Sequence, residues 1–72
     1  PPPAASPNPL DRSGIRDLQL LLNRLGYPSG SPDGRIGPNT REAIRAFERR
    51  HGMQVRGRAT DHVLGAARAA AG

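Results

Sequence analysis

The chain has 72 residues, a formal net charge of +5 and no cysteine. This length allows one small domain with a compact core, because such a chain buries only about 60% of its unfolded surface. The absence of cysteine excludes disulfides and thiolate metal sites. All eleven basic residues are arginine, a composition that favours anionic partners but is equally typical of a solvated surface.

The N-terminal segment has the composition of a linker. Pro1 to Pro9 contains five prolines in nine positions and no large apolar residue. Such a composition favours an extended, polyproline-like tether that contributes nothing to a core. We therefore expect a linker over residues 1–9 and a folded domain over residues 10–72. Neither a transmembrane segment nor a signal peptide is recognisable in the sequence, so no membrane insertion is expected.

A first helix is predicted from Asp11 to Leu25. Its apolar positions recur at helical spacing and share one face; they are Ile15, Leu18, Leu21, Leu22 and Leu25. Asp11 or Ser13 can cap the start, and Gly26 ends the helix as a C′ glycine. Leu20 falls on the opposite side of the helix, where it is either a solvent-exposed residue or a contact for a partner.

A second helix is predicted from Pro38 or Asn39 to about Arg50. Asn39 and Glu42 stand at the spacing of a capping box, and Gly52 follows the end of the helix. The buried face should consist of Thr40, Ala43, Ile44 and Phe47. The opposite face carries Arg41, Arg45 and Arg49 at four-residue intervals, and we expect it to be solvated.

A third helix is predicted after a short extended connector in which Met53 and Val55 alternate inward. Thr60 is a suitable N-cap for this helix. Its apolar stripe consists of Val63, Leu64 and Ala67. No stretch is long enough to build a sheet. The sequence therefore predicts an all-α fold, a small three-helix bundle with a long loop of Gly, Pro and Asp residues between the first two helices.

The end of that long loop, from Asp33 to Arg41, carries the densest turn chemistry of the chain. Gly34 and Gly37 permit positive φ, and Pro38 presets φ for a first helical turn. The Asp33 carboxylate can accept hydrogen bonds from amides just downstream. We therefore expect a structural role, shaping the loop, for Asp33, Gly34, Gly37 and Thr40.

The sequence does not indicate catalysis or metal binding. Only His51 and His62 could act as bases, and no hydroxyl residue stands in a nucleophile motif. The hydroxyl residues considered are Ser13, Ser29, Ser31, Thr40 and Thr60. The two histidines with Asp33 and Asp61 match no zinc-ligand spacing. Neither a metal nor a cofactor is expected.

Three helices and a row of arginines superficially suit a helix-turn-helix protein. Residues 26–37, however, separate the first two helices by far more than the usual turn of about three or four residues. Tyr27 and Phe47 are the only aromatic residues available for stacking on bases. We therefore expect no nucleic-acid partner.

Taken together in order, these segments resemble the peptidoglycan-binding domain 1 family. The matching pattern is Ile15-x-x-Leu18-Gln19-x-x-Leu22-Asn23-x-Leu25-Gly26-Tyr27, then Gly30-x-x-Asp33-Gly34-x-Ile36-Gly37-Pro38-x-Thr40-Arg41-x-Ala43-Ile44-x-x-Phe47, then Gly52-Met53 and Gly57-x-Ala59-Thr60. Three residues depart from the usual pattern: Glu48 replaces Gln after Phe47, Ile36 replaces the commoner Phe, and Leu20 occupies a position that is more often polar.

The resemblance implies a non-catalytic, monomeric module that binds peptidoglycan, both glycan and stem peptide. It implies attachment through a linker to a cell-wall hydrolase or another envelope protein, in the periplasm, the cell envelope or the secreted fraction. We expect the ligand-binding rim to comprise Tyr27, Arg35, Asn39 and Arg41. In this hypothesis Arg35 or Arg41 pairs with a stem-peptide carboxylate, while Tyr27 packs on sugar or peptide.

A rival interpretation keeps the fold but not the ligand. In it, the domain is a structural or protein-interaction module that docks on its parent protein or on a partner. The contacts would be Leu20 and the arginines of the second helix.

Overall fold

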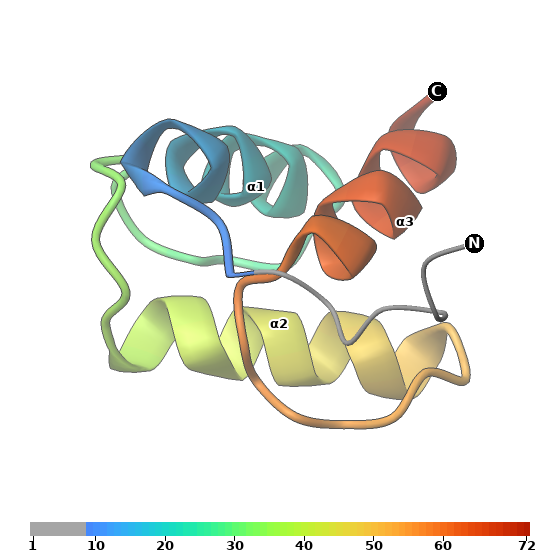
Figure 1. The fold of residues 1–72 in the computed structure, drawn as a ribbon. Helices are drawn as coiled ribbons and strands as arrows, with labels where there is room; N and C mark the ends of the chain where they lie inside the picture. The colour runs from blue at the N-terminus through green and yellow to red at the C-terminus, as the bar shows by residue number, and fades with distance from the viewer. Residues whose placement is uncertain (1–8) are drawn as a thin grey trace, which may run out of the picture.

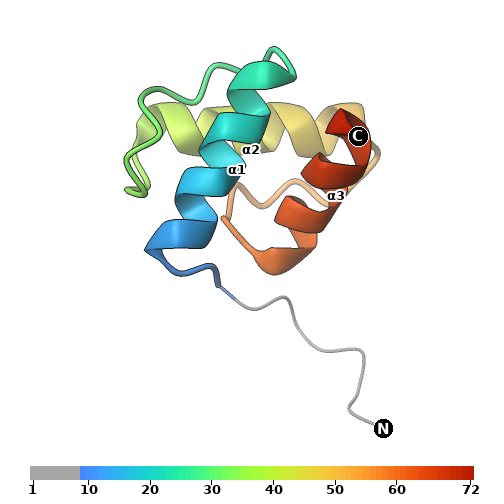
Figure 2. The ribbon, with the colours of Figure 1, turned by 90° about the horizontal axis from the view of Figure 1, so that it is seen from above.

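The computed structural model describes residues 9–72 and contains three helices, α1 (Arg12–Arg24), α2 (Pro38–Arg50) and α3 (Asp61–Ala71). Figures 1 and 2 show α1 and α3 side by side in one layer that lies over α2. Residues 9–72 contain no strand, so the prediction of a small all-α, three-helix domain is confirmed. None of the helices in this part of the chain has the length and apolar composition needed to cross a membrane.

The helix ends follow the local signals in the sequence. Asp11 is the N-cap of α1, and its side chain accepts a hydrogen bond from the Gly14 amide at 2.8 Å. Gly26 follows the helix with a φ of 92°, a conformation that favours glycine. Thr60 caps α3 by accepting from the Val63 amide at 3.3 Å. These caps satisfy amide donors that have no partner within a helix.

The core lies where the three apolar stripes meet. Its buried apolar members are Leu18, Leu22, Ala43, Ile44, Phe47, Val63, Leu64 and Ala67. Phe47 is the largest buried side chain, and the ring of Tyr27 meets it edge to face with centroids 5.7 Å apart. Leu20 lies outside this cluster and is 43% exposed, as its position on the helix predicts.

α2 begins at Pro38, one of the two predicted starts, but its N-cap differs from the prediction. Gly37 is the N-cap and Pro38 occupies the first turn, so Asn39 does not cap the helix. The predicted capping box of Asn39 and Glu42 is therefore wrong. Proline suits the first helical position because it has no amide hydrogen to leave unpaired. Glu42 instead forms an ion pair of 3.0 Å with Arg45.

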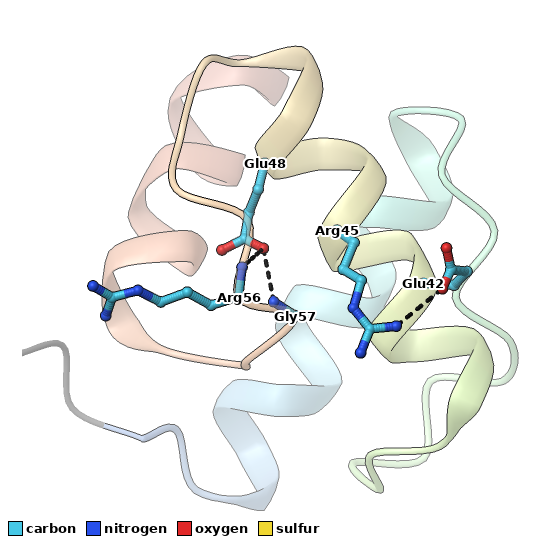
Figure 3. A network of polar contacts seen from close by, with 5 residues as sticks. All are labelled: Glu42, Arg45, Glu48, Arg56 and Gly57. Atoms are coloured by element: carbon cyan, nitrogen blue, oxygen red, sulfur yellow. Dashed lines mark hydrogen bonds and ion pairs between the residues drawn. The ribbon is translucent and has the colours of Figure 1, made fainter.

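The connector between α2 and α3 is held by a buried carboxylate (Figure 3). Glu48 is 3% exposed and accepts hydrogen bonds from the amides of Arg56 and Gly57, both at 2.9 Å. This contact draws the backbone of the connector toward α2, and Val55 is 44% exposed instead of pointing inward. The inward orientation predicted for Val55 is wrong, whereas Met53 packs against the core.

The chain enters the fold beside the start of α3. Pro9 forms an isolated antiparallel bridge with Thr60, and the Leu10 amide donates to the Ala59 carbonyl at 3.1 Å. The predicted linker over residues 1–9 lies outside the described residues except for Pro9. Leu10 packs against the core, at the predicted first position of the domain.

Candidate functional site

The long loop between α1 and α2 is anchored by the side chain of Gln19, which is 1% exposed. Its amide nitrogen donates to the Arg35 carbonyl at 2.8 Å and to the Thr40 hydroxyl at 3.0 Å. Its oxygen accepts from the Gly34 amide at 2.9 Å. One side chain of α1 therefore binds both the loop and the first turn of α2, and this fixes the loop against the helices.

A second polar contact fixes the middle of the loop. Ser29 is 2% exposed, and its amide donates to the Asn23 side-chain oxygen at 2.8 Å. Asn23 also donates to the Gly30 carbonyl at 3.0 Å. The Thr40 hydroxyl donates to the Ser29 carbonyl at 3.0 Å. No buried side-chain nitrogen or oxygen within residues 9–72 lacks a hydrogen-bond partner, so this buried polar network is fully satisfied.

Asp33 shapes the last turn of the loop. Its carboxylate accepts a hydrogen bond from the Arg35 amide at 2.8 Å. That bond favours the charged form, so it lowers the pKa of Asp33 below its usual value. Gly34 follows with a φ of 80° and lies so close to Arg12 that a side chain at this position would overlap it. The structural role of Asp33 and Gly34 stays a prediction, which substitutions at these two positions can test.

Three of the four predicted ligand-binding residues lie around the start of α2. Arg35, Asn39 and Arg41 are all exposed. The Arg35 backbone is held at both ends, since its amide donates to Asp33 and its carbonyl accepts from Gln19. Asn39 lies next to Gly30 of the loop. The Arg35 side chain, which could contact a ligand, therefore extends from a backbone that Asp33 and Gln19 hold in place.

Tyr27 lies beside the C-terminal half of α2, whereas the other three residues lie around its start. It contacts Phe47, which follows Asn39 by eight residues, or about 12 Å along the helix axis. Tyr27 is also part of the apolar packing around the core. A ligand that touches all four predicted residues must therefore extend along α2, as an oligomeric chain does.

On the other side of the loop, a surface depression of about 530 Å³ separates the loop from the first half of α1. It is lined by Arg12, Ser13, Arg16, Asp17, Pro32 and Asp33. Arg12 is fixed there by a hydrogen bond of 3.3 Å from its Nε to the Asp33 carbonyl. The depression thus combines guanidinium and carboxylate groups.

The histidine and the serine considered above as candidate catalytic groups make structural contacts. His51 caps the C-terminal end of α2, and its ring lies on Phe47 with centroids 4.3 Å apart. The Ser29 hydroxyl forms hydrogen bonds with the Gln19 carbonyl and the Asn23 side-chain oxygen. Residues 9–72 hold no group of three potential metal ligands.

Sequence reasoning identified the loop but missed the residues that anchor it. The predicted buried faces do not include Gln19 or Glu48, and Ser29 enters the sequence-based prediction only as a hydroxyl residue without a nucleophile motif. A signal for Gln19 was present, because it lies within the apolar stripe that joins Ile15 to Leu22. A polar residue at such a position must find hydrogen-bond partners inside the fold.

The chain was compared with known proteins. A family model with the description "Putative peptidoglycan binding domain" matches residues 11–66. Among solved structures, the chain is similar to the crystal structure of SltB3 from Pseudomonas aeruginosa in complex with NAG-anhNAM-pentapeptide, at 42% sequence identity and a TM-score of 0.79. The similarity covers 83% of this chain and 16% of SltB3. No curated protein matches the chain.

Proposed function

This chain belongs to the peptidoglycan-binding domain family, and from that premise we propose that it is a non-catalytic module that anchors a larger envelope protein or cell-wall hydrolase to peptidoglycan. Residues 11–66, over which the family model matches, include most of the folded part of the chain. That match is the observation on which the proposal depends. The Pro-rich segment before the fold would act as the tether.

The similarity to SltB3 supports the choice of ligand. SltB3 was crystallised with a disaccharide that carries a pentapeptide, the two kinds of component that peptidoglycan presents. The similarity covers only 16% of SltB3. The attachment of this chain to an envelope protein or hydrolase is therefore proposed separately from its ligand. We propose that the domain acts as a monomer in the periplasm, in the envelope or outside the cell.

The proposed binding rim consists of Tyr27, Arg35, Asn39 and Arg41. The exposed guanidinium of Arg35 or Arg41 would pair with a carboxylate of the stem peptide, and Asn39 would bind amide or hydroxyl groups. Tyr27 offers a ring face with a polar end, which suits the apolar face of a sugar. The spacing of about 12 Å between Asn39 and Phe47, the contact of Tyr27, suits an extended ligand.

Sedimentation with purified peptidoglycan sacculi tests the proposal. In about 0.15 M salt, where the Debye length is about 8 Å, the chain should pellet with the sacculi and release no soluble sugar. Arg41→Gln should lower the bound fraction about two- to fivefold. Arg50→Gln is the matched control, because it removes the same charge from an exposed position at the other end of α2.

A chain that stays in the supernatant would overturn the proposal and favour the interaction module with Leu20 as its contact. Binding that disappears entirely in moderate salt, with equal losses in Arg41→Gln and Arg50→Gln, would indicate attraction by net charge alone.

A further inference from the structure

The depression between α1 and the loop has an unusual balance of charge for so basic a chain. Positions 12, 13, 16 and 17 share one face of α1, because residues four apart are neighbours on a helix. Pro32 and Asp33 form the opposite wall. Its charged groups are two guanidiniums and two carboxylates, so the depression is close to neutral although the whole chain carries +5.

Two of these groups are held in place by the fold. Arg12 donates from Nε to the Asp33 carbonyl, and its side chain packs over Gly34. Asp33 is fixed in turn by the Arg35 amide. The bond from Nε leaves the terminal nitrogens of Arg12 for a ligand. The carboxylate of Asp33 places a negative charge on the opposite wall of the depression.

The other two groups are accessible. Arg16 is exposed and forms no ion pair with the rest of residues 9–72. Asp17 faces Arg68 of α3 at 3.9 Å, which is beyond hydrogen-bond distance, and both side chains are more than half exposed. An ion pair of this kind contributes little. Asp17 can therefore exchange Arg68 for a ligand cation at small cost.

From this arrangement we infer that the depression between α1 and the loop is a binding site for an amphoteric peptide segment, with carboxylate groups on Arg12 and Arg16 and an ammonium group on Asp17 and Asp33. A purely anionic ligand would meet repulsion from both aspartates. A volume of about 530 Å³ suits a segment of a few residues.

This inference rests on the proposed function for its choice of ligand and extends it. Stem peptides that contain a diamino acid carry both free carboxylates and a free amine. None of the four rim residues lines the depression. The rim on α2 and the depression on α1 would therefore take different parts of one ligand. The part of the stem peptide that carries the amine would lie in the depression, and another carboxylate of the same stem peptide would lie at the rim.

The test is an NMR titration of the 72-residue chain with an N-acetylated stem pentapeptide that contains diaminopimelate. Two derivatives serve as comparisons, one with the side-chain amine acetylated and one with the carboxylates amidated. The unmodified peptide should bind with a Kd near the millimolar range, and each derivative about two- to fivefold more weakly. Equal binding of the three peptides, or no binding of any, would overturn the inference.

A matched pair of variants tests whether the peptide binds in the depression. Arg16→Glu and Arg24→Glu make the same change in net charge at exposed positions of α1, but only Arg16 lines the depression. Arg16→Glu should weaken the unmodified peptide about tenfold, and Arg24→Glu less than about twofold. Asp17→Asn should reduce the preference for the free over the acetylated amine, because only the carboxylate of Asp33 then remains in the depression. Equal losses in the two arginine variants would overturn the inference.

The two proposals fail separately. If sacculi pellet the chain but the peptides do not bind, the peptide site is wrong and the proposed function stands. If the peptides bind through Arg16 and sacculi do not pellet the chain, the site stands and anchoring to peptidoglycan is wrong.

Discussion

Replacing Gln19 by Leu should destabilise the domain more than any exposed substitution. The variant keeps the side chain roughly the same size but removes three hydrogen bonds, to Gly34, Arg35 and Thr40. The Thr40 hydroxyl keeps its bond to the Ser29 carbonyl, and the carbonyl of exposed Arg35 can turn to water. The amide of buried Gly34 has no such alternative.

The expected loss in the free energy of unfolding follows from what happens to each of the three hydrogen-bond partners. An unsatisfied buried amide costs about 1–3 kcal/mol, and each of the two other lost bonds costs about 0.5–1.5 kcal/mol. Burying a leucine side chain offsets about 1–2 kcal/mol of this loss. At the middle of these ranges, the net destabilisation is about 2.5 kcal/mol. For a domain of this size, that loss lowers the Tm by about 10–20 °C.

Thermal unfolding followed by circular dichroism measures the effect of Gln19→Leu. Gln54→Leu is the matched control, because Gln54 is exposed and bonds to the exposed side chain of Arg56. The control should change stability by less than about 0.5 kcal/mol. A Gln19→Leu variant that melts within a few degrees of the parent would refute the assignment of Gln19 as the anchor of the loop.

Three further substitutions test other parts of the scaffold. Glu48→Leu should cost about 2–4 kcal/mol in urea unfolding because two amides of the connector lose their acceptor, whereas Glu48→Gln keeps an acceptor and should cost less than about 1 kcal/mol. Gly34→Ala should cost at least about 2 kcal/mol, since it combines positive φ with a clash against Arg12; an unchanged urea midpoint would contradict this. The lowered folded-state pKa of Asp33 means that its carboxylate adds stability above its ordinary pKa of 3.8, and this contribution is lost as pH falls through the lower folded value. The Tm of Asp33→Asn should therefore fall less than that of the parent between about pH 5 and pH 2, and parallel curves would exclude this linkage.

The helices could be predicted because their signals are local. Leu18 and Leu22 mark the buried face of α1, Gly26 ends it, and Thr60 starts α3. Each signal acts within a few residues of the structure it determines. The error at Asn39 has the same origin, because its spacing to Glu42 fits a capping box whether or not the helix begins there. Pro38 decides the position of the helix start.

The anchoring of the loop could not be predicted in the same way. Gln19 bonds to residues 15 to 21 positions away, and those partners are known only once the helices are packed. Glu48 likewise acts on a connector that must first fold back along α2. Its carboxylate therefore has a structural role. The usual family residue, Gln, also has an acceptor oxygen, so the contact with the connector amides does not require the departure to Glu.

The structure also refines what the loop does for the candidate site. Asp33 accepts a hydrogen bond from the Arg35 amide, and the Gly34 amide donates to Gln19. Arg35 and Asn39 extend from that fixed backbone, but the loop has a second side that faces Arg12. The sequence predicted a single rim, whereas the fold places charged groups on both sides of the loop.

The most direct test of where the domain binds is an amide NMR titration of the 72-residue chain with NAG-anhNAM-pentapeptide. We predict saturable shifts at Tyr27, Arg35, Asn39 and Arg41, with His62 on α3 unaffected as an internal reference. Absence of shifts up to about 5 mM ligand, which corresponds to a binding free energy weaker than about 3 kcal/mol, would contradict the proposed function. Shifts confined to α3 would contradict the location of the rim.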